Sequence, residues 1–490
     1  MKFKINKIFI ILILLLSIFV AGCDKNNNNK ICEKIIIYTT NDFHGSIEEE
    51  DGKYGAARMS GFIKTSIEEN KDAASIVLSS GDMFQGSAIS NYTKGEIVVD
   101  IMNEIAFDAM TIGNHEFDWG LSTVLNYCDG NSENGEANFP FLGCNIVEKS
   151  TSTLPEYVKP YHIVEEKGLK IGIIGYMGKG LESSIATNMI ENYYFSDPVA
   201  AIKEYASLLR TDLGCDVVIA SGHDGTTSVN KQISKLVGDE RIDAIVNGHT
   251  HAVYTESYKR DDGVTIPVIQ TGTAGENVGV ITLSIDSQTK SVTSGTAYNQ
   301  QLGKRITPDE VVKKMVDDIV LETAFVFKKV LCTAGVEINQ VKGAKWAVNT
   351  LIDAMEVDVA FINSGGIRNS AFPILNNEEV TVSKVFEIMP FDNTIKTCYL
   401  KGSYVRSIIL SNGIVTSENV TSDDTMRYYI NGELLDDNKL YKVAAVDYIY
   451  DQANYPFSYG KDSVSTGILF RDILIKELED INNSGQKWLG

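Results

Sequence analysis

Positive charge is scarce in this sequence. Its 490 residues include 44 lysines and arginines against 65 aspartates and glutamates, which gives a formal net charge of −21 at pH 7. A chain this acidic offers no basic track for polymeric nucleic acid and no attraction to an anionic membrane surface. A small anionic substrate would have to find its positive charge in a few arginines or in bound metal ions.

Cysteine pairs with metal-binding spacing are also absent. Apart from Cys23, the six remaining cysteines form no Cys-x-x-Cys pair. Cys215 and Cys398 lie beside or inside apolar runs and are expected to be buried thiols. Cys128 and Cys144 could form a disulfide in an oxidising compartment, which their spacing leaves open. We assign none of these thiols a catalytic role.

The apolar run from Ile8 to Val20 is short for a membrane-spanning helix. It follows a lysine-rich start and ends in small residues, so residues 1–22 are predicted to be a signal peptide. The ending Val20-Ala21-Gly22-Cys23 resembles a bacterial lipobox, which implies lipidation of Cys23 after cleavage. Residues 23–33 would then form a flexible tether, and the protein would be extracytoplasmic and lipid-anchored to the bacterial cell membrane. An uncleaved anchor helix is the alternative.

The rest of the chain has the pattern of a mixed α/β protein. A hydrophobic content of 43% and a charged content of 22% are ordinary for globular proteins, and the length allows two or more domains. Continuous short apolar runs predict strands that are buried on both faces. Strands are expected at residues 34–40, 75–80, 139–146, 169–176, 216–223, 243–247, 268–271, 278–285, 357–362 and 441–448, and helices at 54–70 and 96–105.

The most informative stretch is Thr111-Ile112-Gly113-Asn114-His115-Glu116-Phe117-Asp118. Because an apolar run precedes it, it should be the end of a buried strand that opens into a loop. The amide oxygen of Asn114 can ligate a hard cation, and His115 can transfer a proton. Asp118 can hold the imidazole in one tautomer, although a carboxylate at a helix start is the alternative interpretation.

Histidines are concentrated at the ends of apolar runs. Five of the six follow such runs in loops that contain Gly or Asn, and only His162 does not. Ligand residues gather at strand ends in open α/β sheets, whereas core histidines would be scattered. Read singly, Asp42-x-His44 is a surface turn and Asp82 a helix N-cap. The joint pattern instead predicts a metal site, whose proposed ligands are Asp42, His44, Asp82, Asn114, His223, His249 and His251.

These ligands are too many for one ion, but two ions that share Asp82 would use them all. The many imidazoles disfavour Mg²⁺ and Ca²⁺ and favour Zn²⁺, Mn²⁺ or Fe. Two such ions can lower the pKa of a bridging water towards neutrality and can hold the oxygens of a phosphoryl group during in-line attack. His115 would then stabilise developing charge or protonate the leaving oxygen, with Asp118 orienting its ring.

The second half of the chain begins with a predicted helix over about residues 306–330. Thr307 as N-cap, Pro308 in the first turn and Glu310 are its start signals. It is expected to connect two domains, with an ordinary structural helix as the alternative. Later, the strand at 357–362 leads into Asn363-Ser364-Gly365-Gly366-Ile367-Arg368. Bare glycines beside an arginine could approach an anion, although this pattern alone is also that of a turn with a solvated arginine.

Taken in order, these motifs resemble the calcineurin-like metallophosphoesterases, and Asn114-His115-Glu116-Phe117-Asp118 resembles the 5′-nucleotidase/2′,3′-cyclic-nucleotide phosphodiesterase family. The resemblance implies one metal held by Asp42, His44 and His251, another held by Asn114, His223 and His249, and Asp82 between them. It implies that His115 and Asp118 form the catalytic dyad. The implied fold is a four-layer sandwich of two mixed β-sheets flanked by helices, followed by a smaller α/β 5′-nucleotidase domain. The expected segments are 34–305 for the first domain, 306–335 for a linker helix and 336–490 for the substrate-binding domain.

The same family carries Asn-x-Gly-Gly-x-Arg, Pro-Phe-x-Asn and a Tyr-x-Val strand in its C-terminal domain. The resemblance implies that Arg368 meets the phosphate beside Asn363 and Gly366, and that two aromatic rings enclose the base. The family's Gly-Gly-Asp-Gly-aromatic loop is replaced here by Asp451-Gln452-Ala453-Asn454-Tyr455-Pro456-Phe457. Tyr455 and Phe457 are therefore the candidate stacking residues.

These observations predict an extracytoplasmic two-metal phosphohydrolase in which a metal-bridging hydroxide attacks phosphorus. Nucleoside 5′-monophosphates are the expected substrates. A cyclic-nucleotide or nucleotide-sugar phosphodiesterase is the enzymatic alternative, and a metal-binding or nucleotide-binding surface lipoprotein without activity is the other. His115 and Asp118 argue against the last, because metal binding needs neither. The expected partner is a small nucleotide, with no nucleic acid polymer and with membrane contact only through the lipid.

Overall fold

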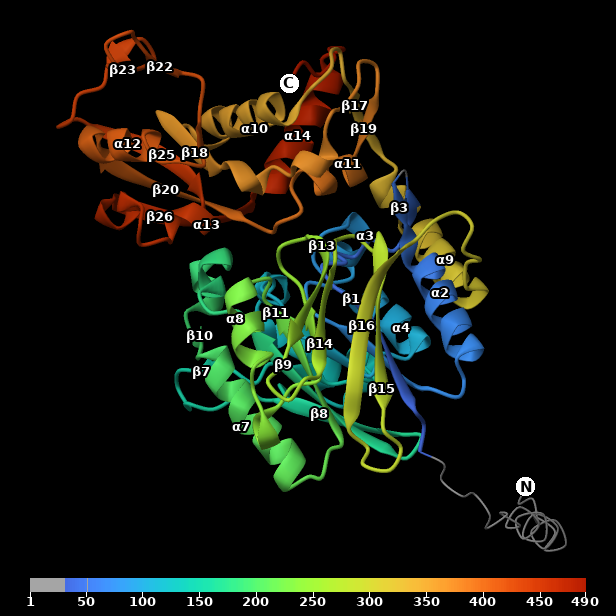
Figure 1. The fold of residues 1–490 in the computed structure, drawn as a ribbon. Coiled ribbons are helices and arrows are strands. Elements are labelled where there is room, and N and C mark those ends of the chain that lie inside the picture. Colours follow the sequence, from blue (N-terminus) through green and yellow to red (C-terminus); the bar gives the residue numbers. More distant parts are fainter. Residues whose placement is uncertain (1–30, 51) are drawn as a thin grey trace, which may run out of the picture.

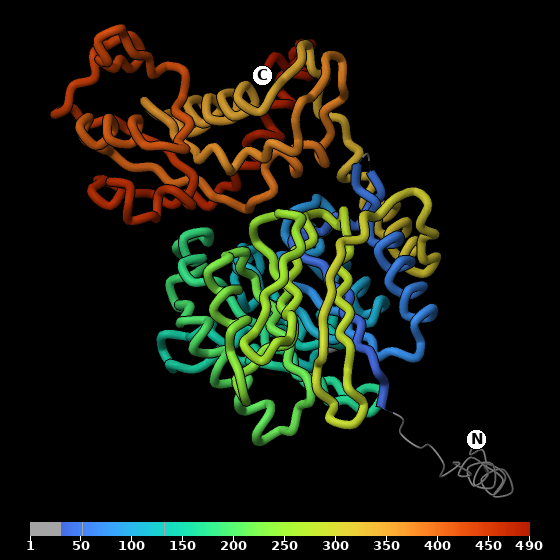
Figure 2. The backbone as a smooth tube through the Cα atoms, in the orientation of Figure 1, coloured from blue at the N-terminus to red at the C-terminus, as the bar shows by residue number. Residues whose placement is uncertain are grey.

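The computed structural model describes residues 31–50 and 52–490. The predicted signal peptide, Cys23 and the tether up to residue 30 lie outside these described residues. Within them, no helix combines the length and the apolar character needed to cross a bilayer. Two domains follow one another along the chain: Figure 2 shows one coloured blue to yellow and the other orange to red.

The N-terminal domain is built on two mixed six-stranded sheets. The first has the order β16-β15-β1-β4-β5-β6, formed by β1 (Lys34–Thr40), β4 (Ala74–Ser79), β5 (Ala109–Thr111), β6 (Phe141–Leu142), β15 (Asn277–Ile285) and β16 (Val292–Gln301). The second has the order β13-β14-β12-β11-β9-β8, formed by β8 (Tyr161–Glu166), β9 (Leu169–Met177), β11 (Val217–His223), β12 (Ala244–Asn247), β13 (Val253–Lys259) and β14 (Thr265–Thr271). Parallel pairs join β1, β4, β5 and β6 in one sheet and β9, β11, β12 and β14 in the other.

Alternate residues of the central strands explain the layering. The two sheets pack face to face through a buried cluster that includes Ile35, Ile37, Ile76, Leu78, Ile171, Ile173, Val217 and Ile219. The residues between them point outwards, towards helices on either side, so the strands are apolar on both faces, as their continuous apolar runs predict. The helices are α2 (Gly55–Glu69), α3 (Ala88–Tyr92), α4 (Glu96–Ile105), α5 (Leu121–Leu125), α6 (Thr187–Ile190), α7 (Pro198–Thr211) and α8 (Thr227–Ile233). Figure 1 shows α2 and α4 on one side and α7 and α8 on the other, which is the predicted four-layer arrangement.

Two local predictions were wrong. The run at 139–146 is not one strand: β6 ends at Leu142, and Ile146 begins the short strand β7 (Ile146–Glu148), which pairs with β10 (Tyr193–Phe195). Between them, the Asn145 side-chain amide accepts from Met177 N (2.8 Å) and donates to Met177 O (2.9 Å). This side chain therefore satisfies both backbone groups of Met177 at the end of β9.

The N-cap of the connecting helix α9 (Glu310–Phe327) is Asp309 and not Thr307. The Asp309 carboxylate accepts from Val311 N at 2.9 Å and also binds Ser60 Oγ (2.7 Å) and Lys64 Nζ (2.6 Å) on α2. Because α2 supplies these two partners, the helix start is fixed two residues later than the turn chemistry suggests. Helix α9 lies against α2 and α4 in Figure 1.

The C-terminal domain has a five-stranded sheet of order β21-β18-β25-β20-β26. Its strands are β18 (Val359–Asn363), β20 (Thr394–Lys401), β21 (Ile414–Thr416), β25 (Leu440–Val446) and β26 (Lys461–Leu469). The helices are α10 (Gln340–Met355), α11 (Val382–Ile388), α12 (Gly402–Ile409), α13 (Asp447–Tyr450) and α14 (Phe470–Asn483). Short pairs complete the chain, namely β2 (Glu49–Glu50) with β3 (Lys53–Tyr54), β17 (Val330–Thr333) with β19 (Glu379–Thr381), and β22 (Val420–Ser422), β23 (Tyr428–Ile430) and β24 (Glu433–Leu434) together.

Candidate metal centre and active site

The loops that follow β1, β4, β5, β11 and β12 meet at one edge of the N-terminal domain. Because these strands run parallel within each sheet, their carboxyl ends share that edge. All seven residues that the sequence predicted as ligands lie there, as do His115 and Asp118. His162 lies elsewhere, half-buried on the edge strand β8.

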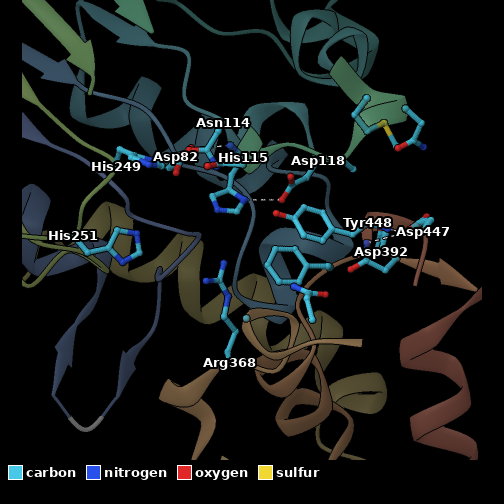
Figure 3. Close-up of a pocket in the computed structure, with 18 of the residues that line it drawn as sticks. Asp82, Asn114, His115, Asp118, His249, His251, Arg368, Asp392, Asp447 and Tyr448 are labelled. Carbon is cyan, nitrogen blue, oxygen red and sulfur yellow. Dashed lines mark hydrogen bonds and ion pairs between the residues drawn. The ribbon is translucent and has the colours of Figure 1, made fainter. Parts of the chain in front are cut away.

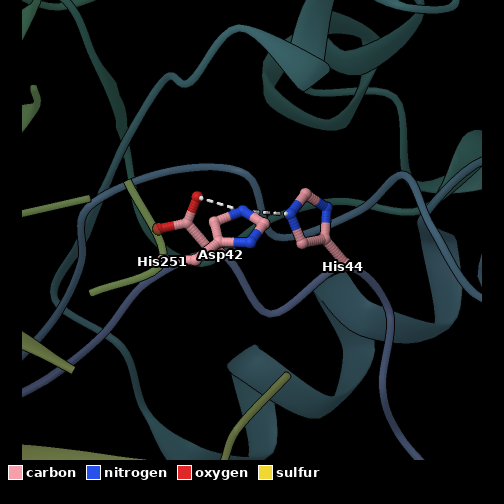
Figure 4. Close-up of side chains that lie close together, drawn as sticks. All are labelled: Asp42, His44 and His251. Carbon is pink, nitrogen blue, oxygen red and sulfur yellow. Dashed lines mark hydrogen bonds and ion pairs between the residues drawn. The ribbon is translucent and has the colours of Figure 1, made fainter. Parts of the chain in front are cut away.

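One cluster consists of Asp42, His44 and His251 (Figure 4). His251 Nε2 lies 3.3 Å from Asp42 Oδ1 and 3.2 Å from His44 Nε2. Facing ring nitrogens at this distance repel unless a proton or a cation lies between them. Ligand atoms of a tetrahedral Zn²⁺ with bonds of about 2.0–2.1 Å are expected to lie about 3.3 Å apart, and both distances are close to that value.

The second cluster consists of Asp82, His223 and His249, with Asn114 beside them. His223 Nε2 lies 3.1 Å from Asp82 Oδ2 and 3.0 Å from Asn114 Oδ1. The same amide oxygen lies 2.9 Å from His249 Nδ1. Two ring nitrogens, a carboxylate and an amide oxygen thus converge on one point, a donor set that suits a borderline divalent metal.

In two of the cluster histidines, the ring nitrogen that faces away from the cluster lies at hydrogen-bond distance from a main-chain carbonyl. His44 Nδ1 lies 2.8 Å from Gln85 O, and His223 Nδ1 lies 2.8 Å from Ser80 O. Donation of Nδ1–H to a carbonyl selects the tautomer that leaves Nε2 with a lone pair for a metal. These two rings are therefore already oriented as ligands.

The backbone of the cluster residues is strained. A positive φ is uncommon for non-glycine residues and costs about 1–3 kcal/mol when the surroundings enforce it. Five of the seven candidate ligands adopt one: Asp42 (48°), His44 (51°), Asp82 (54°), His249 (78°) and His251 (56°). Backbone strain that is concentrated at the candidate ligand residues indicates a functional site rather than a set of ordinary turns.

His115 and Asp118 form a pair at the edge of the second cluster. His115 Nδ1 lies 2.7 Å from Asp118 Oδ2, and the His115 backbone N–H donates to Asp82 Oδ1 at 2.8 Å. Burial disfavours the charged imidazolium, but the carboxylates of Asp118 and Asp82 outweigh it and raise the pKa of His115 to about 9. The ring can therefore carry a proton at neutral pH, as a general acid must.

The pKa values of the neighbouring imidazoles of His44 and His223 are shifted in opposite directions. Burial and the charge of His115 lower the pKa of His44 to about 3. For His223 burial acts in the same direction, but Asp82 overrides it and raises the pKa to about 10. A divalent cation would compete with that proton for Nε2, so metal binding at the second cluster is expected to release a proton.

A cavity of about 410 Å³ opens onto both clusters, lined by residues of both domains. Figure 3 shows His115, Asp118, Arg368 and Tyr448 around it. The Arg368 guanidinium lies 4.8 Å from the centre of the Phe391 ring, which is itself stacked on His115 with centroids 6.0 Å apart. Burial lowers the pKa of Arg368 against the opposing effect of Asp118 and Asp82. This cavity is large enough for a small phosphorylated molecule.

The segment Met389–Asn393, which we call the docking strap, joins the cavity wall to the N-terminal domain. Pro390 O accepts from Gln85 Nε2 (3.1 Å) and Asn91 Nδ2 (2.8 Å). Asp392 lies 2.5 Å from Lys94 Nζ. The C-terminal domain is thus held on the catalytic edge by the same residues that flank Phe391.

The residues predicted to bind substrate are only partly gathered at the cavity. Asn363 and Arg368 line it, but Gly366 does not, and its neighbour Gly365 does. Phe457 is 1% exposed, inside the C-terminal domain, where its ring packs against Tyr450 (4.8 Å). Tyr455 packs beside Phe457 and is likewise not part of the wall. The stacking role predicted for these two residues is therefore not supported.

Several wall residues escaped prediction, among them Phe391, Asn393 and Tyr448. The Pro-Phe-x-Asn motif that contains Phe391 and Asn393 was the available signal. Tyr448 was predicted as the last residue of the strand 441–448, but β25 ends at Val446 and Tyr448 lies in α13. Glu116 was also missed, although it belongs to the central motif; it is completely buried between the two loops that carry Asp82 and Asn114.

Comparisons with known proteins agree with this geometry. Residues 36–253 match the family model "Calcineurin-like phosphoesterase", and residues 332–457 match "5'-nucleotidase, C-terminal domain"; together they cover more than half of the chain. A snake venom 5'-nucleotidase from Crotalus adamanteus is 28% identical over 422 residues, covering 76% of this chain and 69% of that protein. Another from Naja atra is 29% identical over 422 residues, covering 76% and 77%.

Among solved structures, the 5'-nucleotidase precursor from Thermus thermophilus superposes with a TM-score of 0.74 at 20% identity, covering 91% of this chain and 96% of that one. At this identity the likeness concerns the fold, and it extends over both domains. The chain therefore belongs to the calcineurin-like metallophosphoesterases that carry a 5′-nucleotidase C-terminal domain, and it is a phosphoric ester hydrolase of that family.

Proposed function

We propose that the protein removes phosphate from nucleoside 5′-monophosphates outside the cytoplasm. The observation that carries this proposal is one cavity that joins both histidine clusters, the pair His115–Asp118 and the guanidinium of Arg368 to the rings of Phe391 and Tyr448. A phosphate can lie at one end of it and a nucleobase at the other.

Two divalent ions, of Zn, Mn or Fe, fit the donor atoms. Asp42, His44 and His251 would hold one, and Asn114, His223 and His249 the other, with Asp82 between them. When bound, the ions supply an activated water and neutralise the charge of the phosphoryl group. They also supply, at the site, positive charge that a chain with a net charge of −21 otherwise has little of.

Side chains of this protein perform the remaining steps. Arg368 binds phosphoryl oxygens from the C-terminal side, opposite the clusters. His115 delivers a proton to the leaving oxygen of the sugar, and Asp118, at 2.7 Å, holds the ring in the required tautomer. The partial burial of the pair strengthens the His115–Asp118 interaction.

The far end of the cavity suits a nucleobase. Asp447 accepts from Asn393 Nδ2 (2.8 Å), Thr394 N (3.0 Å) and Tyr448 N (2.8 Å). Since its amide nitrogen faces Asp447, Asn393 has its oxygen left to accept from an amino or imino group of a base. Tyr448 provides an aromatic face for stacking.

Replacing Tyr448 with alanine tests this assignment. A lost base–aromatic stack is worth about 1–3 kcal/mol, so KM for AMP should rise roughly 5- to 150-fold. KM for p-nitrophenyl phosphate, which has no base, should stay within about twofold. Tyr455→Ala is the matched control and should leave both values unchanged. Equal effects of Tyr448→Ala on both esters would argue against nucleoside recognition at this end.

A phosphodiesterase activity is a second candidate because a further cavity of about 410 Å³ lies beyond Arg368. Its wall includes His44, His251 and Arg368, so a second substituent on the phosphorus could extend into it. Hydrolysis of AMP, a UDP-sugar, 2′,3′-cyclic AMP and a non-nucleotide monoester, each with Mn²⁺ or Zn²⁺, separates the two. AMP as the fastest substrate supports the monoesterase, and preference for a diester supports the alternative.

We also propose attachment to the bacterial cell membrane through lipid on Cys23. The Val20-Ala21-Gly22-Cys23 ending supports it. Cys23→Ser should move the protein from the membrane fraction to the soluble fraction of cells that express it. A variant that still sediments with membranes would contradict the lipid anchor.

A further inference from the structure

Glu116 is the one acidic residue of the central motif without a role in the proposed reaction. Its side chain is 0% exposed, and it faces neither the cavity nor either histidine cluster as a ligand. A buried carboxylate is costly unless several hydrogen bonds satisfy its oxygens. Its partners should therefore show what it is for.

All three donors to Glu116 are backbone amides of two catalytic loops. Oε2 accepts from Asp82 N (2.9 Å) and Gly113 N (2.6 Å), and Oε1 accepts from Met83 N (2.9 Å). The first and third amides belong to the loop after β4, and the second to the loop after β5. One carboxylate thus links the loop that carries Asp82 to the loop that carries Asn114 and His115.

A second bond runs in the opposite direction. The backbone N–H of His115 donates to Asp82 Oδ1 at 2.8 Å. Each loop therefore donates an amide to a carboxylate of the other loop. The loops also touch, since a Cβ at Gly113 would lie 2.2 Å from Asp82 Oδ1. Asp82 itself keeps a φ of 54°, a conformation that its surroundings must enforce.

We infer that Glu116 is a positioning residue that fixes Asp82 relative to Asn114 and His115. This inference rests on the proposed function, in which Asp82 lies between the two ions. Glu116 belongs neither to the cavity wall nor to either candidate ligand cluster. It sets the separation between the shared carboxylate and the ligand and proton donor of the neighbouring loop.

A carboxylate that only stabilises the same strands, without positioning a ligand, provides the comparison for Glu116. Asp108, just before β5, accepts from Val77 N of β4 at 2.8 Å. It is a carboxylate bound to the backbone of the same pair of strands, but it lies outside the two loops that carry the cluster residues. Asp108→Asn is therefore the matched control for replacing a carboxylate bound to these strands by a carboxamide, because its remaining oxygen can still accept from Val77 N.

Glu116→Gln tests the inference in the metal-loaded full chain. A carboxamide has a single acceptor oxygen, so it leaves at least one of the three amides without a partner. Affinity for the more weakly held Mn²⁺, measured by metal titration, should fall about 10- to 100-fold, as for other residues that orient ligands. Electron paramagnetic resonance should show magnetically isolated Mn²⁺ in place of coupled pairs. Asp108→Asn should leave both metal measurements unchanged.

Unaltered Mn²⁺ affinity and coupling in Glu116→Gln would overturn the inference. If this variant does not fold, Glu116→Asp keeps the charge but is one methylene shorter, so it should reach one loop only and change the coupling as well. Collapse of both variants would make Glu116 a folding residue and would also overturn the positioning role. Failure of the proposed function would look different, because the unmodified protein itself would then bind no Mn²⁺ pair or hydrolyse no phosphate ester.

Discussion

Replacing His115 with alanine is expected to lower kcat about 100- to 10,000-fold while both metal ions stay bound. Loss of a positioned general acid has an effect of this size. The side chain is not among the clustered ligand atoms, so metal content should not change. Its backbone N–H, which binds Asp82, is retained in alanine. The measurements are steady-state hydrolysis of AMP and metal analysis of the same sample.

His162→Ala is the matched control for this experiment. His162 is the one histidine outside the site, half-buried on β8, and its removal should leave kcat within about twofold. The mechanism would be refuted by a His115→Ala variant that keeps its metals and hydrolyses AMP at the unmodified rate. Loss of metal in that variant would instead place His115 among the ligands.

Asp82→Asn should lower both the metal content and the activity. The amide keeps one acceptor oxygen for the His115 N–H but has neither the charge nor the second oxygen needed to serve two ions. At least one ion should be lost, and kcat/KM should fall by about a thousandfold or more, because a metal supplies several kcal/mol of transition-state stabilisation. Metal analysis and AMP hydrolysis at several Mn²⁺ concentrations measure both effects.

Chelation of the unmodified protein provides the comparison for this variant. Chelator treatment should abolish hydrolysis, and added Mn²⁺ or Zn²⁺ should restore it in the unmodified protein but not in Asp82→Asn. Near-normal activity of Asp82→Asn at saturating Mn²⁺ would show that Asp82 does not join the two ions. Asp108→Asn, which removes a carboxylate from the same pair of strands, should retain full metal content.

The metal clusters could be predicted from sequence because parallel strands determine where their carboxyl ends lie. Asp42, Asp82, Asn114 and His223 each follow a continuous apolar run, and that pattern places them at a common edge before any coordinates are known. The positive φ angles of Asp42, His44, Asp82, His249 and His251 could not be predicted in this way. They depend on how the loops of the two sheets pack against one another.

The substrate side was harder to predict because an aromatic residue in a loop can face in or out. Phe457 lies in the short 3₁₀ turn Pro456–Tyr459, which turns its ring into the core against Tyr450. Tyr448 instead reaches the cavity because Asp447 holds its backbone N–H at the start of α13. Local sequence does not distinguish these two outcomes, which depend on how the loop packs on the sheet.

The docking strap has a consequence for how this enzyme can diverge. Phe391 forms part of the cavity wall, while its neighbours Pro390 and Asp392 hold Gln85, Asn91 and Lys94 across the domain boundary. A mutation in the docking strap that reshapes the cavity wall therefore also disturbs the contacts between the two domains. Drift towards a new substrate would have to proceed by paired changes on both sides of that boundary, which narrows the mutational routes open to it.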